Sequence, residues 1–181
     1  MNRIWITATV ALMVLTGCAA APPSQDHADN NSTAHSVVES TCKDSTNIGT
    51  QSVDLQQVRL HSDESELLVE YTLSDALPAK ADVLLYIMAR SPNNETRYQL
   101  GTEFKDGTQS AQFVYDVTSS TQKKISPEAV VTNRTVTAHF PLGDLDGLGT
   151  GFEWDARVSV DGSGVDRCPA GETAKWNVHA N

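Results

Sequence analysis

Apolar and polar side chains alternate along most of the chain after Val53, with the period of two that is typical of strands burying one face. The alternation recurs in short segments that are separated by residues favouring turns. We expect about eight strands, at residues 53–60, 67–74, 83–89, 97–104, 111–117, 135–140, 152–160 and 176–180. The pattern predicts an all-β domain, an antiparallel β-sandwich of the jelly-roll or Ig-like kind, with little helix outside the N-terminal segment.

Three local features refine this prediction. The first strand changes parity between Leu55 and Val58, which predicts a β-bulge near Gln56-Gln57. Asp106-Gly107 is a two-residue turn signal and predicts a hairpin between segments 97–104 and 111–117. Segment 83–89 is apolar on both parities, which indicates a central strand covered on each side.

Most aromatic side chains fall on the apolar parity of their strands and are expected in the core: Tyr71, Tyr98, Tyr115, Trp154 and Trp176. Tyr86 falls on the other parity of the central strand. It is therefore the best candidate for an exposed ring that stacks on a sugar, although burial under a neighbouring sheet or loop also fits an apolar strand.

The N-terminal segment has the layout of a secretory signal, with a positive charge at Arg3, an apolar stretch from Ile4 to Leu15 and then small residues. The apolar stretch is shorter than the roughly 20 residues that span a bilayer. Its end, Leu15-Thr16-Gly17-Cys18, resembles the lipobox of bacterial lipoprotein precursors. The resemblance implies that residues 1–17 are removed and that Cys18 carries diacylglycerol. The expected location is the extracytoplasmic face of the cell membrane, or the outer membrane if the source is diderm.

Residues 18–41 contain no aromatic and almost no large aliphatic side chain, so they bury too little surface to order themselves and are expected to form a tether. Residues 42–181 then form a single domain. The formal net charge of the whole chain is −10, which argues against a nucleic-acid partner and against attraction to anionic membranes. The lipid on Cys18 is the expected attachment to the membrane.

With Cys18 assigned to lipid, Cys42 and Cys168 remain, and an even pair in an exported chain predicts a disulfide. A metal site with two free thiols is the alternative, but no Cys-x-x-Cys or neighbouring His pattern supports it. Chain entropy suggests a stabilisation of roughly 4 to 5 kcal/mol, as an upper figure, for a loop of this length.

Residues 135–141, followed by Leu142, Leu145 and the sequence Phe-Glu-Trp-Asp-Ala-Arg at 152–157, resemble the closing strands of some jelly-roll sandwiches. These include family 9 carbohydrate-binding modules and DOMON domains. For a DOMON-like domain the resemblance implies haem held by a Met and a His from different strands, and Met88 and His139 are the candidate pair. A Met inside an apolar strand usually packs, however, and no cofactor is expected.

No nucleophile elbow, HExxH motif, P-loop or glycine-rich dinucleotide motif occurs, and no enzyme activity is expected. The candidates for a ligand-binding surface alternate with core residues: Tyr86, Arg97, Gln99, Glu153, Asp155 and Arg157. A solvated sheet face would have the same composition. Asp144 and Asp146 are weak candidates for Ca²⁺ ligands, but they also suit a turn, and no metal is expected.

We therefore expect a lipid-anchored envelope protein that acts as a non-catalytic binding or interaction module, with an envelope protein or glycan as partner. The alternative is a carbohydrate-binding module for envelope glycans, which alone predicts retention on sugar. An envelope hydrolase with an irregular site also remains open, and a deep cleft that collects Asp and Glu would reveal it.

Overall fold

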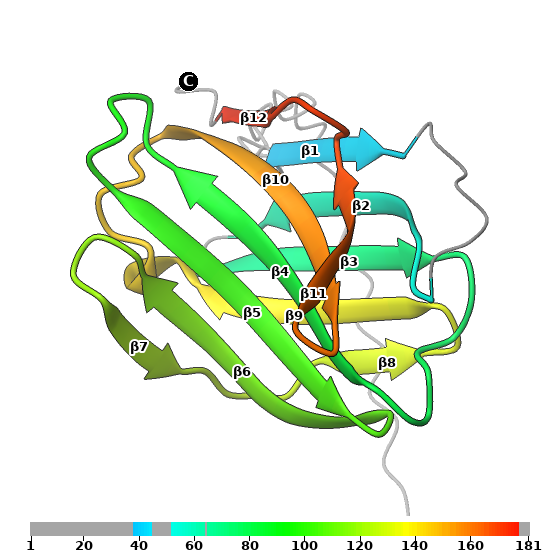
Figure 1. Ribbon diagram of the computed structural model, residues 1–181. Coiled ribbons are helices and arrows are strands. Elements are labelled where there is room, and N and C mark those ends of the chain that lie inside the picture. Colours follow the sequence, from blue (N-terminus) through cyan, green and yellow to red (C-terminus); the bar gives the residue numbers. More distant parts are fainter. Residues whose placement is uncertain (1–37, 45–51, 64, 178–181) are drawn as a thin grey trace, which may run out of the picture. The chain divides into compact units, whose positions relative to one another are not determined.

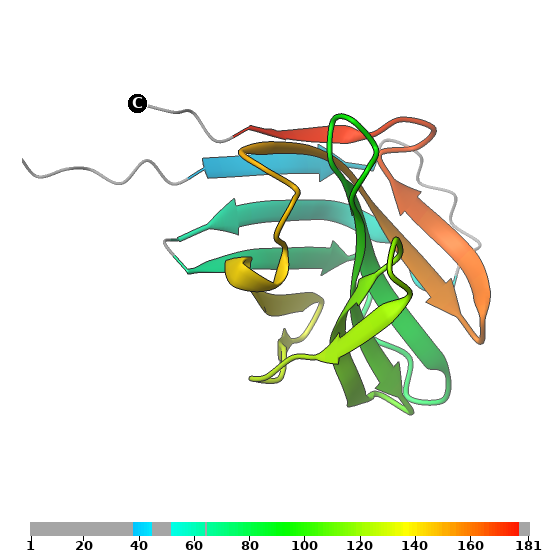
Figure 2. The ribbon, with the colours of Figure 1, turned by 90° about the vertical axis from the view of Figure 1, so that its left-hand side faces the viewer.

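Two antiparallel sheets pack face to face as a β-sandwich, which confirms the predicted fold class (Figures 1 and 2). The computed structural model describes residues 38–44, 52–63 and 65–177. Within these residues the helical structure is one short 3-10 turn at Leu142–Asp144, and no helix is long and apolar enough to cross a membrane.

The five-stranded sheet has the order β1-β2-β3-β9-β8, and the seven-stranded sheet has the order β11-β10-β4-β5-β6-β7, with β12 also paired to β10. The strands of the first sheet are β1 (Val38–Lys43), β2 (Leu55–Ser62), β3 (Glu66–Leu73), β8 (Val130–Thr132) and β9 (Thr135–Pro141). Those of the second are β4 (Asp82–Arg90), β5 (Arg97–Lys105), β6 (Thr108–Asp116), β7 (Thr121–Lys124), β10 (Gly151–Val160), β11 (Ser163–Cys168) and β12 (Ala174–Asn177).

The core lies between the sheets and takes alternate residues from each strand, because successive side chains of a strand point to opposite faces. In β4, for example, the buried positions are Val83, Leu85, Ile87 and Ala89. The bulkiest fully buried side chains come from both sheets: Trp154, Tyr71, Phe104 and Phe140.

Two local predictions are confirmed. Leu55 pairs with Leu73 and Gln57 pairs with Thr72, which leaves Gln56 as the bulged residue of β2. Asp106 and Gly107 join β5 to β6, with φ values of 51° and 75°. Positive φ at both turn residues is what a tight two-residue hairpin requires.

Four strands, β1, β7, β8 and β11, were not predicted, so the described residues hold twelve strands instead of about eight. Every residue of β7 and β8 is exposed, and their sequences therefore carry no alternation. β1 includes residues 38–41, which composition assigned to the tether. Its buried residues, Val38 and Cys42, are separated by three residues with polar side chains, so the strand has too little apolar character to be recognised.

A bulge in β6 overturns the prediction that Tyr115 faces the core, and it turns Phe113 outward as well. Phe104 pairs with Gln109, but the preceding Glu103 pairs with Ala111, which leaves Ser110 as the extra residue. A shift of one residue sends every later side chain of a strand to the opposite face.

The bulge places Gln112 and Val114 in the core and Phe113 and Tyr115 on the outer face, where Phe113 pairs with Gly101 and Tyr115 with Gln99. The side-chain nitrogen of Gln112 donates a hydrogen bond of 2.7 Å to the carbonyl of His139 in the other sheet. The remaining core aromatics, Tyr71, Tyr98, Trp154 and Trp176, are buried as predicted.

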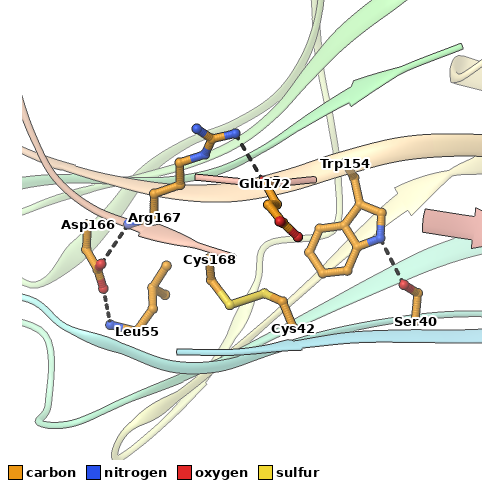
Figure 3. Close-up of a disulfide and its surroundings, with 8 residues drawn as sticks. All are labelled: Ser40, Cys42, Leu55, Trp154, Asp166, Arg167, Cys168 and Glu172. Carbon is orange, nitrogen blue, oxygen red and sulfur yellow. Dashed lines mark hydrogen bonds between the residues drawn. A yellow bond between two sulfur atoms is a disulfide. The ribbon is translucent and has the colours of Figure 1, made fainter. Parts of the chain in front are cut away.

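The predicted disulfide between Cys42 and Cys168 is present, and it joins β1 of one sheet to β11 of the other (Figure 3). The same edge carries further links between the sheets. A carboxylate oxygen of Asp166 accepts a hydrogen bond of 2.6 Å from the amide of Leu55, and the hydroxyl of Ser40 accepts one of 3.0 Å from the indole of Trp154.

Candidate functional site

The outer face of the seven-stranded sheet, which is turned toward the viewer in Figure 1, carries a cluster of arginine side chains. Four of the seven arginines of the chain belong to it: Arg90 of β4, Arg97 of β5, Arg157 of β10 and Arg167 of β11. This concentration of positive charge contrasts with the net charge of −10 of the whole chain.

The register of the strands places these arginines in two directly opposed pairs, Arg90 with Arg97 and Arg157 with Arg167. Residues directly opposite each other in an antiparallel pair lie on the same face with their Cβ atoms about 5 Å apart, and like charges there are destabilising. An acidic group placed between the two arginines of a pair would offset this repulsion.

Asp155 offsets the repulsion in one pair. Its side chain is 6% exposed, and its two carboxylate oxygens contact both Arg157 and Arg167. One oxygen lies 2.5 Å from Nε of Arg157, and the other lies 3.3 Å from Nη2 of Arg157 and 3.2 Å from Nη2 of Arg167. The hydrogen bond to Asp155 raises the pKa of Arg157.

Glu153 plays the corresponding part for Arg90. One carboxylate oxygen of Glu153 accepts hydrogen bonds of 2.6 and 3.0 Å from the guanidinium of Arg90, and a third of 3.3 Å from the hydroxyl of Thr173. The hydrogen bond from Arg90 lowers the pKa of Glu153, so this carboxylate is ionised at neutral pH.

Not all donors of the cluster are engaged by the protein. Nε of Arg167 is buried and has no hydrogen-bond partner within the described part of the chain. Arg97 is exposed and makes no ion pair with any residue that the structure describes. Of these donors, the exposed guanidinium of Arg97 is able to bind an acceptor on a ligand.

Three adjacent, shallow hollows lie on this face and share lining residues. The central hollow, of about 460 Å³, is lined by Arg90, Asp155, Arg157, Arg167 and the segment 171–173. It shares residues with a hollow of about 470 Å³ that includes Tyr86 and with a smaller one that includes Met88 and Arg97. We call the whole the arginine groove. The loop between β11 and β12 forms its wall.

Tyr86 is half-buried on the outer face, which agrees with its assignment to the face opposite the core. It pairs with Arg157 on one side and with Gly101 on the other. Gly101 carries no side chain, and the ring of Phe113 occupies the space where one would lie. Tyr86 therefore belongs to a row that contains a second, buried aromatic ring.

Five of the six predicted ligand-binding residues lie in or beside the arginine groove, namely Tyr86, Arg97, Glu153, Asp155 and Arg157. Gln99 lies on the same face between Met88 and Tyr115 and is not among the residues that line the groove. Arg90 and Arg167 were missed. Arg90 follows Tyr86 and Met88 on the same parity and could have been found from that spacing, whereas Arg167 lies on an unpredicted strand.

A second hollow on this sheet, of about 330 Å³, lies near the far ends of β4, β5 and β10. Its charged residues are Asp82, Glu103 and Lys105, and Asp82 lies directly opposite Lys105, so no like charges are directly opposed across it. The arginine groove is the stronger candidate.

An acidic cluster near the disulfide also escaped prediction, because its members are far apart in the sequence. Carboxylate oxygens of Asp44, Asp54 and Asp166 all lie within 4.8 Å of one another. Burial raises the pKa of Asp166, the amides of Leu55 and Arg167 oppose this, and the charges of Asp44 and Asp54 raise it further. Hydrogen bonds engage Asp54 and Asp166, and we assign no ligand to the cluster.

The two weak calcium candidates do not belong to that cluster. The carboxylate of Asp144 forms an ion pair with Lys123, and the backbone carbonyl of Asp146 accepts a hydrogen bond of 2.7 Å from the hydroxyl of Tyr98. Both contacts are ones that a structural turn makes.

Met88 and His139 are not brought together. Met88 lies on the outer face of the seven-stranded sheet, whereas His139 lies on the outer face of the five-stranded sheet, 2.9 Å from a carboxylate oxygen of Glu66. The core separates the two side chains, so they cannot be the two ligands of one haem in this chain.

The lipidation candidate Cys18 and the segments 1–17 and 18–37 lie outside the described residues. The assignment of a signal peptide and lipid anchor therefore stays a prediction. No protein-family model matches the chain, and no curated protein and no solved structure is significantly similar to it.

Proposed function

We propose that this protein is a lipid-anchored lipoprotein of the bacterial envelope that binds a ligand, without catalysis, in the arginine groove. The observation that carries the proposal is the convergence of Arg90, Arg97, Arg157 and Arg167 on one groove of a sandwich whose chain is otherwise acidic. The anchor rests on the sequence Leu15-Thr16-Gly17-Cys18.

The state of the carboxylates in the groove supports binding over catalysis. Asp155 is engaged by two arginines and Glu153 by Arg90 and Thr173. A general acid needs a raised pKa, but the pKa of Glu153 is lowered. Carboxylates held in this way position guanidinium groups, and positioned guanidinium groups recognise ligands.

A glycan fits the groove better than a protein partner does. Arginine, tyrosine and methionine are common in protein interfaces too, but the fully buried centre of an interface is apolar, whereas this surface is polar with one half-buried tyrosine. An aromatic ring beside hydrogen-bonding side chains is suited to a sugar, whose ring has an apolar face and polar edges. The groove thus favours the alternative of a carbohydrate-binding module for envelope glycans.

The anchor is tested by replacing its cysteine. We expect Cys18→Ala to move the protein from the membrane fraction to the soluble fraction after a carbonate wash, because the acyl chains supply the membrane affinity. A Cys42→Ser/Cys168→Ser protein serves as the control and stays with the membrane. Retention of the Cys18→Ala protein in the membrane would show that lipid on this residue is not the anchor.

Binding is tested by sedimentation with purified cell-wall material that retains its attached glycans. We expect the protein to sediment with it and Tyr86→Ala to reduce the bound fraction severalfold, while Tyr115→Ala, on the same face outside the groove, leaves it unchanged. The wall material releases no soluble sugar during incubation if the protein is not an enzyme. Equal binding by the parent and the Tyr86→Ala protein would remove the groove from the proposal.

A further inference from the structure

The two opposed arginine pairs of the groove form an unusual feature of a sheet surface. Each pair places like charges directly across two strands, and the two pairs share one groove. Opposed like charges destabilise a sheet, and a negative charge between them offsets the cost. Asp155 does this for one pair, whereas Glu153 contacts only Arg90 of the other.

The groove retains an unpaired guanidinium after its internal ion pairs are formed. Asp155 is shared between Arg157 and Arg167, and Glu153 contacts Arg90 but not Arg97. Asp166 and Glu172 also line the groove, so its four guanidinium groups lie among four carboxylates, and the unpaired one is that of Arg97. The exposed Arg97 and the buried, unpartnered Nε of Arg167 are donors without a protein acceptor among the described residues.

The guanidinium groups are also held in place before any ligand arrives. Asp155 fixes Arg157 through two oxygen atoms, and the carbonyl of Glu172 accepts a hydrogen bond of 3.2 Å from Nη2 of Arg167 (Figure 3). A planar guanidinium recognises carboxylate and phosphate groups through paired N–H donors, and fixing its orientation lowers the entropy lost on binding.

The spacing of the two pairs fits a ligand with more than one anionic group. Along β10 the position opposite Arg90 is Glu153, four residues from Arg157. Four residues of a strand span about 13 Å. Tyr86, directly opposite Arg157, adds an aromatic surface next to one pair.

We propose that the arginine groove binds an acidic polysaccharide, with carboxylate or phosphate groups on the two arginine pairs and a sugar ring against Tyr86. This inference rests on the proposed function and specifies the ligand of that site. Carboxylate and phosphate share the chemistry that arginine recognises, and the experiment separates them. A membrane of anionic lipid is the competing source of negative charge, and vesicles in the experiment test it.

The test measures retention of the full chain carrying Cys18→Ala, so that lipid does not contribute. The probes are immobilised polygalacturonate, its carboxyl-reduced form, phosphorylated dextran, and vesicles of phosphatidylglycerol with phosphatidylcholine. We expect retention on polygalacturonate, on phosphorylated dextran, or on both. Carboxyl reduction weakens retention on polygalacturonate at least about tenfold, because it removes the acceptors of charge-assisted hydrogen bonds.

Three variants locate the binding. Arg97→Gln removes a guanidinium that has no ion-pair partner within the described residues, and Arg157→Lys keeps the charge but loses the planar fork. We expect each to weaken retention at least about fivefold. The control, Arg134→Gln, removes the same charge from an exposed residue in the turn between β8 and β9 of the other sheet and changes retention less than about twofold. Circular dichroism verifies that the variants are folded.

The outcomes distinguish this inference from the proposed function. Equal retention on polygalacturonate and its carboxyl-reduced form, with loss in Tyr86→Ala, would leave a glycan-binding module and overturn the acidic ligand. Retention by the vesicles alone would overturn the polysaccharide in favour of lipid. No retention on any probe overturns the inference, while sedimentation with cell-wall material still decides the proposed function. An equal loss of retention in Arg134→Gln would show that retention depends on the net charge of the protein and not on the arginine groove.

Discussion

At the scale of single residues, Asp155 has the largest influence on the arginine groove. It lies on the outer face of β10, yet its side chain is only 6% exposed, because two arginines cover it. A buried carboxylate is tolerated when it is paired and hydrogen-bonded. Asp155 meets this condition through Arg157 and Arg167, and in turn it keeps their opposed guanidinium groups together.

We predict that Asp155→Asn lowers the free energy of unfolding by about 1 to 3 kcal/mol, because it leaves two opposed arginines without their shared counterion. Urea denaturation measures the loss. Glu153→Gln is the matched control and produces a clearly smaller loss, since the side chains of Glu153 and Arg90 are 34% and 43% exposed. A larger loss in Glu153→Gln than in Asp155→Asn would contradict this ranking.

At the scale of elements, the bulge at Ser110 decides what the outer face presents. It moves Phe113 from the core to the row of Tyr86, where its ring covers Gly101. A Cβ atom on residue 101 would lie 2.3 Å from Cζ of Phe113, which no real contact allows. Glycine at residue 101 and the aromatic ring at residue 113 are therefore complementary.

Gly101→Ala is predicted to destabilise the domain by about 1 to 3 kcal/mol, because the ring of Phe113 must move. Phe113→Ala opens the space that the new methyl group needs. The double variant should therefore be less destabilised than the sum of the two single variants, and a double-mutant cycle from denaturation curves measures the difference. Additive effects would mean that the two residues do not compete for this space.

The edge strands β1 and β11 belong to different sheets and are joined by the disulfide. We predict that Cys42→Ser/Cys168→Ser lowers the free energy of unfolding by up to about 5 kcal/mol, because the unfolded chain regains the entropy of an open loop of 126 residues. The parent protein in reductant should approach the stability of the double variant, whose own stability does not change. Equal stability of the oxidised parent and the double variant would show that the bridge contributes nothing.

At the scale of the whole molecule, charge is distributed unevenly. The arginine groove gathers positive charge on one face, whereas the cluster of Asp44, Asp54 and Asp166 gathers negative charge near the edge that joins the sheets. The raised pKa of Asp166 means that the folded protein binds its proton more tightly than the unfolded chain does. Its ionisation therefore destabilises the fold, fully above the folded pKa and not at all below the unfolded pKa.

We predict that Asp54→Asn stabilises the protein at pH 7 by less than about 1 kcal/mol, because it removes one charge that repels Asp166. The gain should shrink as the pH falls toward the ordinary carboxylate range, where Asp166 takes up its proton. Denaturation at several pH values measures this trend. Asp75→Asn removes an exposed acidic charge elsewhere and serves as the control. A gain that grows on acidification would contradict the sign of the shift.

The alternation of side chains was sufficient to predict the β-sandwich and most core residues, because burial with a period of two is a local property of the sequence. The turn signal Asp106-Gly107 predicted the hairpin, and the even number of remaining cysteines predicted the disulfide. The bulge at Ser110 was not predicted, because the sequence does not distinguish a polar residue that pairs with the next strand from one that forms a bulge. β7 and β8 were hidden because exposed edge strands need no apolar residues.

The candidate site divides in the same way. The sequence determined which polar side chains face outward, and so it included Tyr86, Arg97, Glu153, Asp155 and Arg157 among the candidates. The partners of these residues, however, depend on strand order and register, which are set by contacts between distant segments. Only the tertiary structure placed Arg167 opposite Arg157 and Arg97 opposite Arg90. The tertiary structure determined the arginine groove, because arginines that are far apart in the sequence become neighbours only when the strands assemble into the sheet.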